Sequence, residues 1–129
     1  MVSKIPILPH RVRHVPAQFS WLDHRLVRER FIDRCTHAAA ALYLFLVTVA
    51  DAAGMSYYGD ASIGQRLSMD TATLQAARDN LVRIGLIAWK RPLYQVLCFE
   101  NRTDAHRTSM AQPASLADIL KKAAAGGAP

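Results

Sequence analysis

Long apolar runs, paired cysteines and glycine-rich loops are missing from this chain of 129 residues. The longest apolar run covers residues 38 to 50, which is 13 residues, whereas a bilayer span needs about 20, so we expect a buried helix and no membrane anchor. Cys35 and Cys98 are isolated, without CxxC or Cys/His spacing, which predicts two reduced packing residues and no metal site. No glycine-rich phosphate-binding loop is present either.

A secretory signal is also not expected. The first 16 residues are basic, but they hold no sustained apolar core and Pro6, Pro9 and Pro16 interrupt them. We therefore expect a cytoplasmic, nucleoid-associated protein. With 51% hydrophobic residues, the chain is long enough for one domain with a real core.

Two polar clusters near the N-terminus have part of the pattern of a metal or catalytic site. His10 and His14 have the spacing of helical metal ligands, but the prolines around them disfavour a helix. Ser20, Asp23 and His24 lie close in sequence without an oxyanion signature. We therefore expect a non-enzymatic protein with no metal and no cofactor.

Positive charge is in excess, at a formal net charge of +6 and a pI near 9.8. Residues 1 to 34 hold seven Lys/Arg against three Asp/Glu, residues 35 to 100 hold five against five, and the remainder holds four against two. The excess thus lies outside the centre of the chain. It suggests an anionic partner, although ordinary solubility gives the same composition.

Proline and capping residues predict the order of the elements. Three prolines make residues 1 to 18 an extended basic arm. Thr36 is a good N-cap, Gly54 a good helix stop and Asp60 a second good N-cap. The elements expected after the arm are short amphipathic helical turns within 19 to 35 that pack on the domain, helices at 37 to 52 and 61 to 67, and an extended piece at 55 to 59.

A third helix and a hairpin should follow. Leu74, Ala77, Leu81 and Ile84 are spaced by three and four, which predicts an inward-facing helical stripe that Gly85 ends. Two short runs rich in β-formers, 86 to 89 and 94 to 99, are joined across Lys90, Arg91, Pro92 and Leu93. Residues 101 to 129 are expected to be a flexible tail, with one short helix at 115 to 125.

The stretch DASIGQRLSMDTATLQAARDNLVRIGLI resembles the two-helix core of the winged helix-turn-helix family of bacterial DNA-binding proteins. It has the small and apolar positions, a Thr at the start of the second helix, and the closing pattern L-x-x-x-G-L-I. The resemblance covers about residues 36 to 99. It implies a mainly α fold with a small antiparallel β-hairpin, in which residues 19 to 100 form a winged-helix domain with a helical preamble.

The resemblance also implies double-stranded DNA as a partner, with the second helix in the major groove and phosphates held by the first helix and the hairpin. Gln can read adenine, and Thr can contact bases or phosphates. Alanines at 72 and 76 and acidic residues at 70 and 79 are departures that weaken base reading. The implied groove-facing residues are Thr71, Thr73, Gln75 and Asp79, with Arg78 on the flank and Arg83 further along. The implied phosphate contacts are Arg66, Lys90 and Arg91. The excess charge of the extended arm adds Arg11 and Arg13 as further expected DNA contacts.

Four further hypotheses follow from this resemblance and from the apolar patterns. The setting is a bacterial transcription regulator, or an accessory or initiator protein of a mobile element or plasmid. The alternative is a winged-helix protein-protein interaction module that recruits a partner. A homodimer is expected through the nearly all-apolar first helix, and a tail contact with a protein is expected through Leu116, Ile119 and Leu120.

Overall fold

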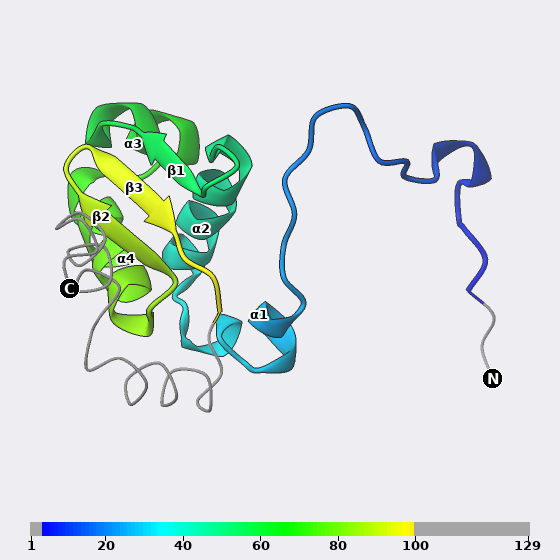
Figure 1. Ribbon diagram of the computed structural model, residues 1–129, viewed down its shortest axis with the longest axis horizontal. Coiled ribbons are helices and arrows are strands. Elements are labelled where there is room, and N and C mark those ends of the chain that lie inside the picture. Colours follow the sequence, from blue (N-terminus) through cyan, green and yellow to red (C-terminus); the bar gives the residue numbers. More distant parts are fainter. Residues whose placement is uncertain (1–3, 100–129) are drawn as a thin grey trace, which may run out of the picture. The chain divides into compact units, whose positions relative to one another are not determined.

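The computed structural model describes residues 4 to 99 (Figure 1). The chain divides into two units, Met1–Leu97 and Cys98–Pro129, and the first unit contains every element given below. The expected tail, with its helix at 115 to 125, lies outside the described residues. The helices are α1 (Arg25–Arg28), α2 (His37–Val49), α3 (Asp60–Leu67) and α4 (Thr71–Ile84), the 3-10 turns are η1 (Pro9–Arg11) and η2 (Ile32–Arg34), and the strands are β1 (Met55–Tyr57), β2 (Ile87–Lys90) and β3 (Leu93–Val96).

The predicted mainly α fold with a small antiparallel sheet is confirmed, but the sheet has one more strand than the predicted hairpin. β3 lies between β1 and β2 and pairs antiparallel with both (Figure 1). β2 and β3 form the predicted hairpin, with strands shorter than expected at its open end. The third strand comes from the extended piece after α2, in which Met55 pairs with Gln95. No local pattern in the sequence indicates a pairing between segments this far apart.

α2 begins at its predicted cap and ends before its predicted end. The Thr36 hydroxyl accepts a hydrogen bond from the Ala39 N–H at 3.0 Å, which satisfies one of the free donors of the first turn. The helix stops at Val49 because Ala50 is already extended. The prediction that Gly54 ends this helix is therefore wrong. Gly54 lies in the following turn with φ +85°, and its carbonyl accepts from the Val96 N–H at 2.7 Å.

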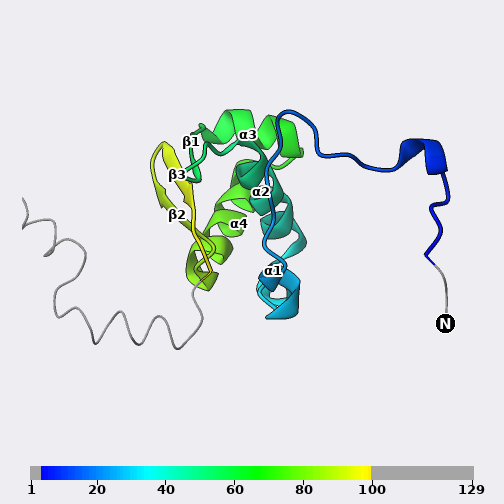
Figure 2. The same ribbon diagram turned by 45° about the vertical axis from the view of Figure 1, so that its right-hand side comes forward.

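The domain itself covers most of the apolar surface of α2. The helix packs on α4 and on β3, and Figure 2 shows the sheet nearly on edge with α2 and α4 on one side of it. Leu44 is the exception among the large apolar residues of α2, since 57% of it is exposed. The buried residues of α2 are Ala39, Leu42, Tyr43, Leu46 and Val47.

A three-residue turn joins α3 to α4. Asp60 was expected from its position to cap α3, but Gly59 is the N-cap and Asp60 is the first helical residue, which frees its carboxylate for another contact. Ser68 ends α3 in the left-handed conformation (φ 55°). Asp70 caps α4 by accepting from the Thr73 N–H at 2.7 Å. The turn closes tightly on Gly64, because a Cβ there would lie 2.8 Å from the Met69 carbonyl oxygen.

The predicted inward stripe of α4 is confirmed for three of its four residues. Leu74, Ala77 and Leu81 are buried, and Ile84 is partly buried at the last turn. Gly85 ends the helix as predicted: its φ is +92° and its N–H donates to the carbonyls of Leu81 and Val82. This left-handed residue turns the chain directly into β2.

Asn80 joins α4 to the start of α2, and its loss is expected to be costly. Its amide oxygen accepts from the Thr36 N–H at 2.8 Å, and its amide nitrogen donates to the Arg34 carbonyl at 3.1 Å. Asn80→Ala would leave both backbone groups without these bonds, so we expect the free energy of unfolding to fall by about 1 to 3 kcal/mol. Urea denaturation measures the change. The adjacent exposed residue gives the control, since Asp79→Ala should cost less than about 0.5 kcal/mol. Equal effects of the two variants would show that the Asn80 bonds contribute nothing.

Candidate nucleic-acid interface

The side of α4 that faces away from the core presents most of the predicted groove-facing residues. Thr71, Gln75 and Asp79 recur every four residues, so they line one face of the helix, and all three are exposed. Thr73 is also exposed, but the helical repeat places it on a different side. Arg83 is exposed in the last turn. The structure thus brings together three of the four predicted groove-facing residues, with Arg83 at the far end.

Small side chains occupy the middle of this exposed face. Ala72 and Ala76 lie opposite the buried stripe, between the positions of Thr71 and Asp79 along the helix. They offer no hydrogen-bonding group, but they allow another surface to approach the α4 backbone closely.

The prediction that Arg78 lies on the flank of this surface is wrong. Only 3% of Arg78 is exposed. Its guanidinium Nη1 donates to Asp60 Oδ1 at 2.8 Å and to the Tyr94 hydroxyl at 3.0 Å. A buried guanidinium needs partners of this kind, and they come from α3 and β3, which sequence spacing alone does not bring to α4. Arg78 therefore cannot contact a nucleic acid directly.

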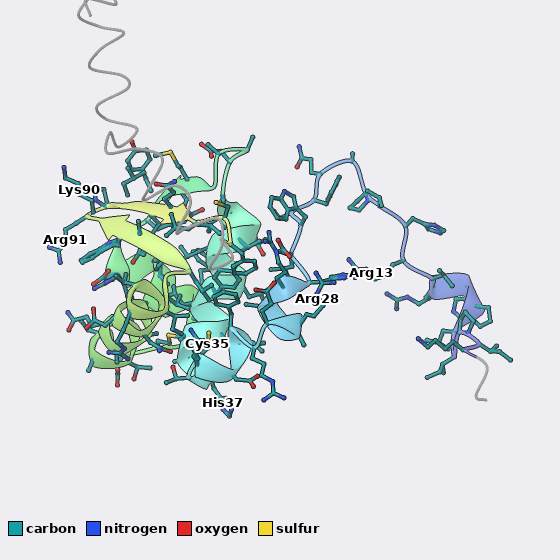
Figure 3. The ribbon with its side chains drawn as sticks, turned by 60° about the horizontal axis from the view of Figure 1, so that its bottom comes forward. Arg13, Arg28, Cys35, His37, Lys90 and Arg91 are labelled. Atoms are coloured by element: carbon teal, nitrogen blue, oxygen red, sulfur yellow. The ribbon has the colours of Figure 1, made fainter. Side chains whose placement is uncertain are left out.

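The tip of the β2–β3 hairpin carries two exposed cations. Lys90 and Arg91 are exposed, and Figure 3 shows both side chains pointing away from the helices. The Arg91 guanidinium lies 5.8 Å from the centre of the Trp89 ring, within the range of a cation–π contact. These two predicted residues are placed as a phosphate contact requires.

Tyr57 is a surface residue beside this tip that the predicted set omits. In the sheet it pairs with Leu93, which pairs in turn with Lys90, so the three side chains share the outer face. Tyr57 is 70% exposed, whereas Tyr58 is half-buried and packs edge-on against Phe45 at 5.1 Å. Strand alternation signals that only one of the two tyrosines faces solvent, but not which one.

Charges of both signs surround the N-terminus of α4. Arg66 is exposed in the last turn of α3, as an external phosphate contact requires. The hydrogen bond from Thr73 lowers the pKa of Asp70, which keeps this exposed carboxylate negative. Asp70 and Asp79 would repel phosphates, so the helices alone present a surface of low net charge.

The arm contributes further exposed cations. Every described residue from 4 to 20 is exposed, including Arg11 at the end of η1 and Arg13 two residues later. Figure 3 labels Arg13 on this extended segment. The arm therefore has side chains available for phosphate contact over most of its length.

The two polar clusters of the N-terminal region do not assemble into sites. η1 ends at Arg11, so His10 and His14 do not share a helix. The Ser20 hydroxyl donates to the Thr48 carbonyl at 3.3 Å, and Arg25 binds the Asp23 carboxylate at 2.8 Å. Within residues 4 to 99, no group of three or more His, Cys, Asp or Glu side chains is placed to hold a metal ion.

Among the described residues, no helix combines the length and the apolar character that crossing a membrane requires. No protein-family model matches the chain, and neither a curated protein nor a solved structure matches it.

Proposed function

We propose that this protein is a non-enzymatic, sequence-preferring double-stranded DNA-binding protein that uses a winged helix-turn-helix. One observation carries the proposal: α3, a three-residue turn and α4 lead into a hairpin that packs on α4 and has Lys90 and Arg91 exposed at its tip. The order helix, short strand, short helix, turn, helix and hairpin is the one that the resemblance implies for a winged helix.

Each part of this surface has a chemical role in the proposal. α4 enters the major groove, where Gln75 accepts and donates at an adenine edge and Thr71 contacts a base or a phosphate. The alanines of α4 let its backbone approach the bases. Lys90 and Arg91 hold phosphates or enter the minor groove, and Tyr57 adds an aromatic surface beside them.

Salt-dependent binding to random duplex DNA tests the proposal. Phosphate contacts release counterions, so the logarithm of the binding constant should fall linearly with the logarithm of salt concentration. Fluorescence anisotropy with a labelled duplex measures this slope. A protein with no salt-sensitive affinity at low ionic strength would refute DNA binding.

The proposed setting is a bacterial transcription regulator, or an accessory or initiator protein of a mobile element or plasmid. Selection of bound fragments from genomic DNA tests this setting and identifies the preferred site in one experiment. Fragments clustered at promoters favour a regulator, and fragments clustered at a replication origin or element end favour an initiator or accessory role.

Gln75→Ala is expected to reduce selectivity more than overall affinity. If Gln75 makes a bidentate base contact, the variant should lose about 1 to 3 kcal/mol at the selected site and little on random DNA. Competition binding with the two DNAs measures the difference. Gln95→Ala removes an exposed glutamine from the sheet and should change neither affinity. An equal loss on both DNAs would assign Gln75 to a phosphate contact instead.

Protein-protein interaction is the second candidate function, because large apolar side chains are exposed outside the proposed DNA surface. Phe19 and Trp21 are exposed to 64% and 73%, and Leu44 of α2 is exposed to 57%. A second copy of the chain is the partner expected for α2. Sedimentation tests the homodimer: a monomer at tens of micromolar, where a contact of about 7 kcal/mol is mostly formed, would remove it.

A further inference from the structure

The Arg78 side chain is the point at which α3, α4 and the hairpin meet. It leaves α4 and binds the first residue of α3 through Asp60 and the centre of β3 through Tyr94. Its guanidinium carbon also lies 3.8 Å from the centre of the Trp89 ring of β2. A planar guanidinium can satisfy these contacts together, since it donates at its edge and stacks with its face.

Trp89 continues this connection to the hairpin tip. The residue is partly buried, pairs with Tyr94 across the sheet, and precedes Lys90 in the chain. The Arg91 guanidinium lies 5.8 Å from the same ring that Arg78 contacts. A single aromatic ring thus links a buried arginine of α4 to an exposed arginine at the tip.

Stability alone does not account for the choice of arginine at position 78. The Nε atom of Arg78 is buried and has no hydrogen-bond partner, and an unsatisfied buried donor opposes folding. Buried ion pairs are often replaceable by apolar residues without loss of stability. The features that an apolar residue cannot reproduce are the directions of the bonds to Asp60 and Tyr94.

We infer that Arg78 is a positioning residue for the hairpin tip: it fixes Trp89, and through Trp89 the cations Lys90 and Arg91, relative to α4. The inference rests on the proposed DNA-binding function, in which α4 and the tip contact one duplex together. Arg78 then acts on DNA affinity without touching DNA, by holding the tip cations at the spacing that the duplex requires.

A double-mutant cycle on the full chain tests the inference. The tip pair Lys90→Ala/Arg91→Ala should lower the affinity of the otherwise unchanged protein for a random duplex by about tenfold at low salt, as two phosphate contacts are lost. In an Arg78→Lys background, which keeps the charge but not the planar fork, the same tip pair should lower affinity by about twofold or less. Arg28→Lys is the control, because Arg28 is exposed in α1 and lies outside the proposed DNA surface; there the tip pair should keep its full effect.

A second measurement reports on Trp89 without DNA. Trp21 and Trp89 are the two tryptophans of the chain, so a Trp21→Phe background isolates Trp89. Arg78→Lys should increase acrylamide quenching of Trp89, and Arg28→Lys should not. Where Arg78→Lys lowers the folded fraction at the assay temperature, Trp89→Leu takes its place in the binding cycle, because it removes the ring that links the two arginines.

The outcomes separate the inference from the proposed function. Tip variants that lower affinity equally in the unchanged and Arg78→Lys backgrounds would overturn the positioning role and leave DNA binding intact. Tip variants without effect on a protein that binds DNA would remove the hairpin contact and the positioning role together. Absence of any DNA binding by the unchanged protein would overturn the proposed function and this inference with it.

Discussion

Gly54→Ala is expected to lower the free energy of unfolding by about 2 to 5 kcal/mol, for two separate reasons. The residue has φ +85°, a left-handed conformation that costs an alanine about 1 to 2 kcal/mol. An added Cβ would also lie 2.6 Å from the Val96 carbonyl oxygen, which is backbone and cannot rotate away. The Val96 N–H also donates a hydrogen bond to the Gly54 carbonyl at 2.7 Å. A backbone shift that relieves the clash would stretch this bond and weaken the attachment of β1 to β3.

Gly85→Ala is the matched control for this effect. Gly85 has a similar φ of +92°, but nothing lies within 4 Å of an added Cβ. Its substitution should therefore cost only the conformational part, about 1 to 2 kcal/mol. Urea or thermal denaturation of both variants separates the two contributions. Equal losses at Gly54 and Gly85 would show that the backbone near Val96 shifts at no cost, against our expectation.

Arg11→Ala/Arg13→Ala is expected to weaken binding to all duplex sequences and to reduce the salt slope by about one to two. Residues 35 to 100 are formally neutral, and Asp70 and Asp79 add negative charge to the α4 surface. The arm holds exposed cations on an extended segment that can follow a phosphate backbone or enter a minor groove. We therefore expect the arm to supply most of the non-specific affinity and α4 to supply modest selectivity.

Salt titrations with random and selected duplexes measure this division. Arg11→Lys/Arg13→Lys keeps both charges and should bind nearly as the unchanged protein does. Thermal stability should be the same in both double variants, because the two side chains are exposed. An alanine double variant with unchanged affinity for random DNA would show that the positive charge of the arm serves solubility instead.

Local patterns in the sequence predict most of the secondary structure, because helix caps and helical periods depend on residues three or four positions apart. The cap at Thr36, the buried stripe of α4 and the left-handed end at Gly85 all belong to this class. The hairpin was also predictable, since its two strands are adjacent in the chain. Exposure of Gln75 follows from the same helical period.

Pairing between distant segments was not predictable in this way. The extended piece after α2 shows no sign in its own residues that it will join β3, and that pairing decides that Gly54 approaches Val96. It also decides that Tyr57, and not Tyr58, is the exposed tyrosine. A strand's alternation defines two faces, but only its partner strand and the covering helices decide which face becomes the core.

The start of α2 at Thr36, the buried stripe of α4 with its end at Gly85, and the basic hairpin tip follow from the sequence alone, because those features depend on near neighbours in the chain. The burial of Arg78 depends on tertiary packing. A lone arginine on a helix is predicted at the surface, since burial of an unpaired guanidinium is unfavourable. The partners that make its burial acceptable are Asp60 and Tyr94, which lie 18 and 16 residues away and reach Arg78 only after α3, α4 and the sheet have packed together.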